Sequence, residues 1–433
     1  MKNTFIRDVL SVFKSKVAII FFNLIKVAIV ARVLGPELNG QIAIILVYPS
    51  LFVVIGGMGI RKSSAFLIAQ SPNLKIKLYK SIVQFWVLTS TVCVLVSVLL
   101  LLYVNKNKLE NIIIFLAVIP IVFSLLNNYM AGIYLGENRI SEFNKINWLP
   151  TLFNLLSIVL FLILLDFKVE GVLMSVLISQ FLVSLLLIYK LNIFKHFSFT
   201  IEKTLLLKML SLGFSFAFAL FLLNLNYRID IIMMDYLSND YETGLYSKAN
   251  VLAQYLWQIP AVLGTVIFAR GAASSDKLEY SKKCCRLFRM SLLIVLLCAL
   301  ILAGLSKFIV NILFGTQFSE AIFMIYGILP GVVLFILFKV LNNDISSRGK
   351  PLFIMPSMIS GILINVISNY FLIPLYGGVG AAISSSISYS FAAIIFIIGY
   401  SRLTKIPLKE IFYYKKNDFE IAYSKVKSLK LLK

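Results

Sequence analysis

The chain has 433 residues, of which 60% are hydrophobic and only 14% are charged, and its mean hydropathy is +0.93. A soluble domain of this length could not bury so much apolar surface, so the composition excludes soluble proteins and indicates a polytopic membrane protein. The 41 Lys and Arg residues exceed the 19 Asp and Glu residues and give a net charge of +22. In a membrane protein the position of each basic residue is more informative than this sum, so a nucleic-acid partner is the weaker explanation of the charge.

The N-terminal residues 1–16 are basic and carry apolar side chains at helical spacing, which is typical of a helix on the membrane surface. Lys26 and Arg32 interrupt the apolar run that follows, and no small-residue cleavage site comes after it, so we expect an uncleaved span rather than a signal peptide. We expect Arg32, near the outer end of this span, to extend toward the membrane interface. About twelve segments are long and apolar enough to cross a bilayer. They lie at residues 17–34, 40–60, 81–104, 111–132, 148–166, 170–189, 209–235, 243–268, 289–312, 320–342, 352–373 and 379–400.

Basic residues are concentrated in alternate loops between these segments. One set of loops contains most of them, whereas the opposite set offers only Lys106, Lys108 and Lys168. By the positive-inside rule the basic loops and both termini are cytoplasmic. The opposite loops are too short to hold an extracytoplasmic domain. The basic loops are those near residues 61–80, 139–145, 190–208, 270–289 and 348–350, together with the tail from 402 to 433.

The two halves of the chain resemble each other. The sequence LGPELNG at residues 34–40 follows the first span, and LSNDYETG at residues 237–244 follows the seventh. Both halves also place a basic residue, an asparagine and a glycine at similar spacing: Arg139, Asn154 and Gly171, then Arg348, Asn365 and Gly380. Several matches in the same order indicate a parallel duplication. We therefore predict an all-α fold of two pseudo-symmetric six-helix lobes around a central cavity.

The predicted lobes have the following boundaries. The N-terminal lobe comprises residues 1–190, and the C-terminal lobe comprises residues 209–400. Residues 191–208 form a cytoplasmic amphipathic linker between them, and residues 401–433 form a basic cytoplasmic tail.

Charged and amide side chains inside the spans are the candidate site residues. An ionisable group within hydrocarbon costs about 2.5–3.5 kcal/mol on insertion scales, so it normally faces a watery cavity or a partner. Lys26 and Asn23 share a face of the first span, and Asn224 and Arg228 share a face of the seventh, with Asp230 nearby. The eighth span carries a polar stripe at helical spacing, with Lys248 beside it: Ser247, Asn250, Gln254 and Gln258.

Each of these features has a structural alternative. Polar stripes can join helices through interhelical hydrogen bonds, and Asp230 could form a buried ion pair with Lys26 or Arg228. However, the embedded cations Lys26, Arg228 and Lys248 outnumber that acid. We therefore interpret them as binding an anionic ligand.

The sequence shows none of the common catalytic or metal-binding motifs. It contains no phosphate-binding glycine loop, no G-x-S-x-G motif and no paired histidine ligands, and its only histidine, His196, lies in a basic loop. Cys284 and Cys285 are adjacent, so no disulfide or metal spacing is evident. We expect a transporter rather than an enzyme, with no cofactor, no metal and no catalytic residue.

At three places the sequence resembles the bacterial polysaccharide flippases, which export O-antigen and capsule repeat units. They belong to the multidrug/oligosaccharidyl-lipid/polysaccharide exporter superfamily. The similar stretches are ARVLGPELNGQIAI (31–44), the region from YRIDIIMMDYL to the end of TGLYSKANVLAQYLWQIP (227–260), and RGKPLF with NVISNYFLIPLYGGVGAAISSSISY (348–389).

The resemblance implies a V-shaped pair of lobes in the bacterial cytoplasmic membrane that works by alternating access. The implied substrate is an undecaprenyl-pyrophosphate-linked oligosaccharide, the implied coupling ion is H⁺ or Na⁺, and a polysaccharide polymerase or chain-length protein is an implied partner. The resemblance implies that Lys26, Arg228 and Lys248 bind the pyrophosphate and that Asp230 is an ion or proton site. The glycan would then contact the amides Asn23, Asn224, Asn250, Gln254 and Gln258.

Two other functions fit parts of the sequence. A multidrug or cation antiporter of the same superfamily would share the fold but would need a more acidic cavity. A membrane polysaccharide polymerase or ligase would need a substantial extracytoplasmic loop, which this chain lacks.

Overall fold

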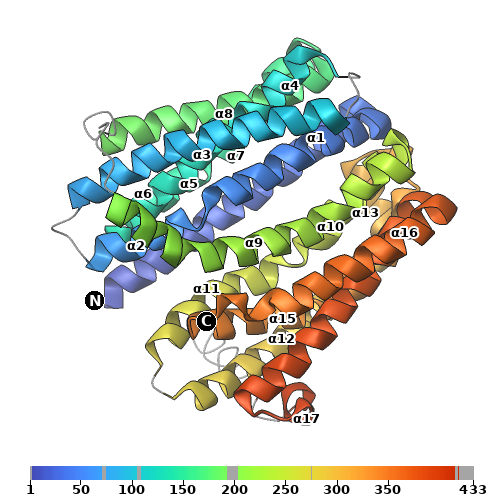
Figure 1. Cartoon of the computed structure of the whole chain (residues 1–433). Coiled ribbons are helices and arrows are strands. Elements are labelled where there is room, and N and C mark those ends of the chain that lie inside the picture. Colours follow the sequence, from blue (N-terminus) through green and yellow to red (C-terminus); the bar gives the residue numbers. More distant parts are fainter. Residues whose placement is uncertain are drawn as a thin grey trace, which may run out of the picture. The chain divides into compact units, whose positions relative to one another are not determined.

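The structure is a computed structural model that describes residues 2–70, 75–104, 109–192, 203–274, 276–414 and 418. Throughout these residues the regular elements are helices, and none is a strand, which confirms the predicted all-α fold (Figure 1). The predicted linker 191–208 and tail 401–433 lie in large part outside the described residues. His196, Lys106 and Lys108 also lie outside them.

Nine helical segments of the described chain are long and apolar enough to span a membrane. Two of them, residues 14–70 and 351–404, are 57 and 54 residues long, and each holds two of the spans predicted from the sequence. The predicted span 243–268 is divided between two shorter helices, each of 16 residues. The polytopic membrane architecture is therefore confirmed, and the count agrees with about twelve crossings.

The two longest helices bend where glycine permits a conformation that other residues avoid. In α1 (Lys2–Gly57) Gly35 has φ 71° and ψ 177°, and in α16 (Met355–Thr404) Gly377 has φ 54° and ψ −133°. Positive φ costs glycine little because it has no Cβ. Pro36 follows the first bend and Pro374 precedes the second, and each lacks the N–H that would continue the helical ladder.

Proline also explains the division of the eighth predicted span. The helix α10 (Asp240–Tyr255) ends just before α11 (Gln258–Ala273), and Pro260 lies in the first turn of α11. A proline ring collides with the carbonyl four residues earlier, which here belongs to Leu256. The chain therefore makes a tighter turn at Leu256 and Trp257, whose amides donate to Ala253 and Gln254.

The chain forms two compact units. Unit 1 comprises residues 1–247 and 311–319, and unit 2 comprises residues 248–310 and 320–433. The helix α9 thus belongs to unit 1, and the two units divide α10 after Ser247. The predicted lobe boundaries at residues 190 and 209 stay a prediction.

Unit 1 is built from helices that pack side by side along their lengths (Figure 1). Besides α1 and the start of α10, its elements are α2 (Ile60–Gln70), α3 (Lys75–Val104), α4 (Asn111–Val118), α5 (Pro120–Gly136), α6 (Ile140–Asn147), α7 (Leu149–Ile158), the π-helix η2 (Val159–Leu164), α8 (Lys168–Leu191), α9 (Lys203–Leu237) and the 3₁₀-helix η4 (Thr316–Phe318).

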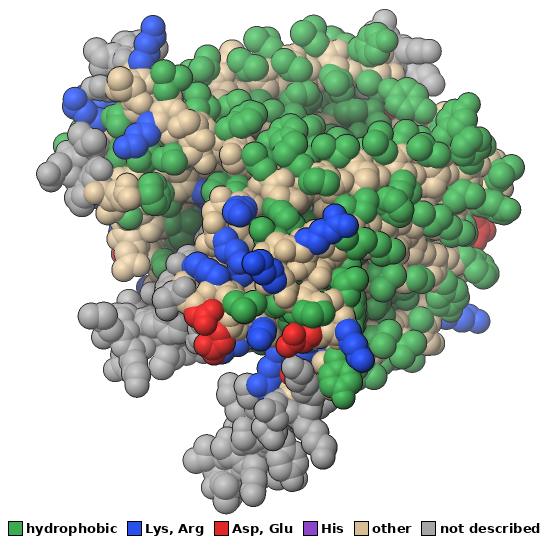
Figure 2. All heavy atoms as spheres, turned by 60° about the horizontal axis from the view of Figure 1, so that its bottom comes forward, with side chains coloured by type: hydrophobic (Ala, Val, Ile, Leu, Met, Phe, Trp, Pro, Cys, Tyr) green, Lys and Arg blue, Asp and Glu red, His purple; other side chains and the backbone are tan. Residues whose placement is uncertain are grey.

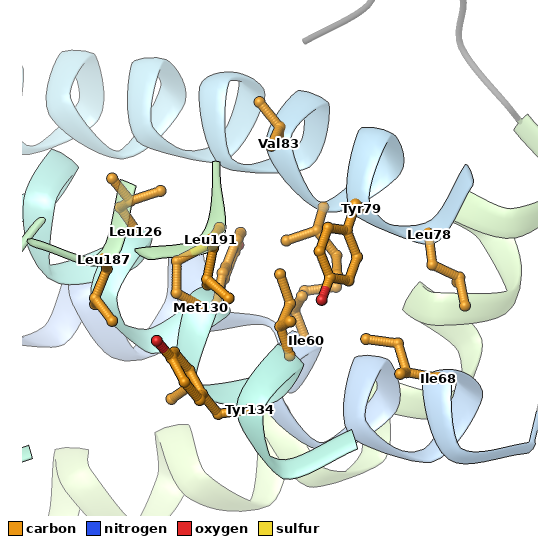
Figure 3. Packing of buried hydrophobic residues seen from close by; sticks show 14 of the residues in the cluster. Ile60, Ile68, Leu78, Tyr79, Val83, Leu126, Met130, Tyr134, Leu187 and Leu191 are labelled. Atoms are coloured by element: carbon orange, nitrogen blue, oxygen red, sulfur yellow. The ribbon is translucent and has the colours of Figure 1, made fainter. Parts of the chain in front are cut away.

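The core of unit 1 gathers buried residues from α2, α3, α5 and α8. Figure 3 shows Ile60, Tyr79, Met130 and Leu187 packed together within it. Close helix contact depends on small residues here, because a Cβ built on Gly132 of α5 would overlap Arg61 and Ser64 of α2.

Unit 2 packs α14 (Ala321–Leu334) against α16 and packs α15 (Ile336–Ser347) against α11. Its remaining elements are α12 (Lys277–Gly304), most of α13 (Ser306–Leu313), the 3₁₀-helix η5 (Pro351–Ile354) and α17 (Leu408–Phe412). A chain of aromatic rings runs through its core from Trp257 to Phe335, Phe338, Phe396 and Tyr400, with centroids 4.8–6.1 Å apart.

Basic and hydrophobic side chains occupy different parts of the surface. Figure 2 shows Lys and Arg side chains gathered at one face of the molecule, with hydrophobic side chains covering the flanks beside it. Large apolar side chains such as Leu99, Leu164, Phe214 and Leu375 are exposed by more than half. Such flanks are suited to lipid, where apolar side chains need no cover from water.

Candidate functional site

Lys26 lies in the apolar part of α1, before the bend at Gly35. It is partly buried, and Asn23 lies one turn earlier on the same face, also partly buried. Within the described residues, no carboxylate pairs with the Lys26 ammonium and no side chain accepts a hydrogen bond from it. The structure therefore does not contain the Lys26–Asp230 ion pair that was the structural alternative.

The exposed side chain of Arg32 binds the end of another helix, and its extension toward the membrane interface stays a prediction. Its guanidinium donates to the carbonyl oxygens of Asn311, Ile312 and Leu313 at 3.2, 2.5 and 3.2 Å. These are the last carbonyls of α13, which have no partner within the helix and attract a cation. Gln317 adds to this contact by donating to the carbonyl of Ala31 at 3.3 Å. The segment 311–319 is thereby attached to the outer part of α1 in unit 1.

The predicted site residues on α9 differ in exposure. Asn224 is partly buried and donates to the carbonyl of Leu220 at 2.8 Å, and Arg228 is exposed. Asp230 is fully buried, and its carboxylate accepts a hydrogen bond of 2.9 Å from the Tyr246 hydroxyl on α10. The carboxylate is thus held by a phenol in the interior of unit 1.

The polar stripe of the eighth predicted span is present only in part. Lys248 is partly buried on α10, and Gln254 donates to the Asn250 side chain at 2.8 Å. Asn250 is buried, so a hydrogen bond within the helix accounts for this side chain at least as well as contact with a ligand does. Gln258 is exposed at the start of α11, beyond the turn caused by Pro260, so it does not continue the stripe on one straight helix.

The predicted residues are divided between the two compact units. Unit 1 contains Asn23, Lys26, Asn224, Arg228 and Asp230. Unit 2 contains the others, which are Lys248, Asn250, Gln254 and Gln258.

Sequence reasoning overlooked one embedded cation. Lys339 lies in α15, inside the span that we predicted at 320–342, and it is partly buried. Its ammonium lies 4.2 Å from the centre of the Trp257 ring and 5.9 Å from that of Phe335. The position of a lysine within an apolar segment was the signal that could have identified it.

Sequence reasoning also overlooked a polar cluster at the end of α5 in unit 1. Glu137, whose side chain is 9% exposed, binds Lys75 and the Tyr79 hydroxyl from α3, and it pairs with Arg139 at 2.9 Å. Burial alone would raise the pKa of the Glu137 carboxyl, but these three hydrogen bonds hold the pKa below its usual value. Arg139 also pairs with Glu142, and the net effect raises the pKa of its guanidinium.

Unit 2 has a corresponding cluster at the end of α15. The buried carboxylate of Asp344 accepts from Ser281, from Tyr400 at 2.9 Å and from Arg348 at 3.3 Å. Arg348 also donates to the carbonyl of Lys277 at 2.8 Å. The residues from α12, Lys277 and Ser281, have the same spacing as Lys75 and Tyr79 of α3, which supports the predicted duplication.

Cations and amides are the polar groups that most of the predicted site positions offer. The embedded cations are accompanied by amides that can hydrogen-bond hydroxyl groups. No cluster of three or more His, Cys, Asp or Glu side chains that could hold a metal occurs in the part of the chain that the structure describes.

Three solved structures have the same fold as this chain. The lipid II flippase MurJ in an inward closed conformation has a TM-score of 0.73 and 17% identity, and the match covers 94% of this chain and 89% of MurJ. An inward-facing multidrug resistance MATE family transporter of the MOP superfamily has a TM-score of 0.69 and 16% identity, with 89% and 95% covered. A MOP superfamily transporter from Pyrococcus furiosus has a TM-score of 0.63 and 17% identity, with 93% and 96% covered.

The sequence itself also matches a known family. No curated protein is significantly similar to the chain. The family model of the polysaccharide biosynthesis proteins, however, matches residues 29–323, which is more than half of the chain. The resemblance stated from the sequence is thereby confirmed, and the chain belongs to the polysaccharide biosynthesis protein family, with the fold of the MOP superfamily.

Proposed function

We propose that this protein is a flippase that moves undecaprenyl-pyrophosphate-linked oligosaccharide repeat units across the bacterial cytoplasmic membrane. The units would serve O-antigen or capsular polysaccharide synthesis. Membership of the polysaccharide biosynthesis family and the transporter fold support this proposal. Transport would proceed by alternating access without a catalytic residue.

One observation carries the proposal: Lys26 is an embedded ammonium to which the described residues offer no carboxylate. A cation at this depth is unfavourable unless water or an anion meets it. The head group of a lipid pyrophosphate supplies such an anion, and lysine binds phosphate well as a compact point charge. Arg228 and Lys248 are the further pyrophosphate-binding residues of this proposal, with Lys248 on α10.

The remaining predicted residues have supporting roles in the proposal. Asn23, Asn224, Asn250, Gln254 and Gln258 would contact the glycan, since amides both donate to and accept from sugar hydroxyls. Asp230 would couple transport to H⁺ or Na⁺, because a buried carboxylate near a phenol can exchange its proton or bind a cation. A polysaccharide polymerase or chain-length protein would receive the exported unit.

Charge distribution supports the proposed orientation, in which both termini are cytoplasmic. The basic loops of the sequence and the basic face in Figure 2 both fit the positive-inside rule. The same face would contact anionic lipid head groups.

A multidrug or cation antiporter is the second candidate, because MATE transporters share the fold. A cationic drug requires an accessible carboxylate in its site. Of the two acids of α9 within the predicted span, Asp230 is fully buried against Tyr246 and only Asp235 is partly accessible, whereas the three cations Lys26, Arg228 and Lys248 are partly or fully accessible. This distribution of charge favours an anionic substrate.

The proposal is tested by export in a flippase-deficient strain, with surface polysaccharide as the readout. We expect Lys26→Gln and Arg228→Gln to abolish export while the protein remains in the membrane. The matched controls are Lys14→Gln and Lys208→Gln, which remove exposed charges from the same helices α1 and α9. Both controls should export normally.

A second measurement separates the two candidate functions. Purified protein in vesicles should translocate a fluorescent prenyl-pyrophosphate-linked oligosaccharide, and loss of the ion gradient should slow the movement. Export by both Gln variants at the wild-type level would refute the anion site. Transport of a cationic dye but not of the lipid-linked oligosaccharide would instead establish the antiporter.

A further inference from the structure

The helix α15 of unit 2 carries a lysine where the surroundings are apolar. Lys339 is partly exposed, although both neighbours in the chain, Phe338 and Val340, are buried. The segment 321–347 that contains it is one of the candidate membrane spans. An ionisable residue at this depth indicates a functional site by default.

The indole of Trp257 holds the lysine in a defined place. The Lys339 ammonium lies 4.2 Å from the ring centre, well within the distance at which a cation interacts with an aromatic face. The indole is itself fixed, because its N–H donates to the carbonyl of Val332 at 3.0 Å and its ring packs against Phe335 and Tyr389 at 5.5 Å each. Trp257 is therefore a rigid support, while the lysine above it remains partly exposed.

The indole follows the amides of α10 closely along the chain. Trp257 follows Gln254 by three residues, and its backbone amide donates to the Gln254 carbonyl. Gln254 in turn donates to the side chain of Asn250. Unit 2 thus holds a cation over a fixed aromatic ring at the junction of α10 and α11, one turn beyond a pair of hydrogen-bonded amides.

We propose that Lys339 binds a phosphate of the prenyl-pyrophosphate carrier, with Trp257 as its positioning residue. This inference rests on the proposed function and adds to it a substrate contact in α15. A phosphate oxygen attracts the ammonium more strongly than an aromatic face does, since a full charge replaces a ring quadrupole. The ligand therefore draws Lys339 away from the indole, which changes the surroundings of Trp257.

The experiment uses Trp257 as its own reporter. The chain has three tryptophans, and Trp86→Phe with Trp148→Phe leaves Trp257 as the sole emitter. The purified full chain in detergent is titrated with farnesyl pyrophosphate, and the affinity is measured in parallel by isothermal titration calorimetry. Farnesol, inorganic pyrophosphate and phosphatidylglycerol are titrated separately to distinguish the prenyl tail, the free anion and an ordinary lipid head group.

We expect a saturable change in Trp257 emission with farnesyl pyrophosphate and a smaller response or none with farnesol and phosphatidylglycerol. Lys339→Gln should weaken binding about tenfold or more, because it removes a charge-assisted hydrogen bond. Lys339→Arg should keep most of the affinity. The matched control is Lys350→Gln, an exposed lysine in the turn after α15, which should bind as the wild type does.

The outcomes separate this inference from the proposed function. Unchanged affinity in Lys339→Gln, even with a lower melting temperature, would assign the lysine a structural role and overturn the inference. If Lys26→Gln nevertheless loses binding while Lys339→Gln does not, the proposed function stands without Lys339. An equal response to farnesol or phosphatidylglycerol would overturn phosphate recognition at Lys339, and no binding of farnesyl pyrophosphate by the wild type would count against both proposals.

Discussion

Replacing Lys26 with Met should make the protein more stable and inactive. Methionine keeps an unbranched chain of similar length but removes the ammonium. A lysine at the centre of a span costs about 2.5–3.5 kcal/mol on insertion scales. Because the proposed anion site would give the ammonium access to water, we expect Lys26→Met to raise the free energy of unfolding by a smaller amount, about 1–2 kcal/mol.

The assay measures stability and transport on the same purified variants. Unfolding is followed by circular dichroism during titration with sodium dodecyl sulfate, and transport is followed with a lipid-linked oligosaccharide in vesicles. Lys14→Met is the matched control, because it removes an exposed charge from the same helix. Its effect on stability should lie within about 0.5 kcal/mol, as is usual for surface substitutions.

Two results would refute this reasoning. A loss of stability by more than about 1 kcal/mol in Lys26→Met would mean that the ammonium stabilises the fold, as partnered groups do. Transport by Lys26→Met at the wild-type rate would mean that no anion depends on this charge. Gain of stability with loss of transport is the pattern expected of a residue retained for function.

Three further predictions concern the helix contacts and the polar clusters. Asp344→Ala should lower the free energy of unfolding by about 3 kcal/mol, because removing one partner of a buried pair leaves the Arg348 guanidinium without its carboxylate. Gly244→Val should lower the melting temperature and the yield, because a Cβ at Gly244 would overlap the carbonyl oxygen of Pro36 on α1. Glu137→Gln should make stability fall less steeply as the pH drops below 4.5. The pKa of Glu137 is lowered in the folded state, so its contribution to stability is complete above the unfolded pKa of 4.5 and is lost as the pH falls through the lower folded pKa.

Each of these predictions has a control or an opposing result. For the buried pair, a change below 1 kcal/mol in sodium dodecyl sulfate titration would contradict the role of Asp344, and the double variant with Arg348→Gln should recover part of the loss. For the helix contact, Gly304→Val is the matched control, because a Cβ there meets nothing within 4 Å. For the carboxyl group, melting temperatures of wild type and Glu137→Gln that fall in parallel below pH 4.5 would show that Glu137 is not responsible.

Comparing the sequences of the two halves revealed the repeat at Gly244 but not the helix contact that it makes. The sequence showed that residues 34–40 and 237–244 are similar, but it did not show that the two segments pack against each other. In unit 1 the two segments lie against each other: a Cβ on Gly40 would overlap the Asp240 carbonyl, and a Cβ on Gly244 would overlap the Pro36 carbonyl. The repeated glycines thus form one reciprocal contact, which no property of either segment alone indicates.

Membrane class, approximate spans and charge asymmetry were determined by the sequence alone. They follow from the hydrophobicity and charge of each segment relative to the bilayer, which do not depend on what the segment packs against. The family was likewise visible in stretches such as residues 31–44, whose resemblance the match over residues 29–323 confirmed.

Only the tertiary structure decided which polar side chains meet. Arg32 binds carbonyls 279 to 281 residues away, Lys339 lies over Trp257, and Asp230 accepts a hydrogen bond from Tyr246 on the next helix. Hydropathy and spacing describe one helix at a time, whereas these contacts depend on how several helices pack. The embedded charges could therefore be found from the sequence, but their partners could be found only from the fold.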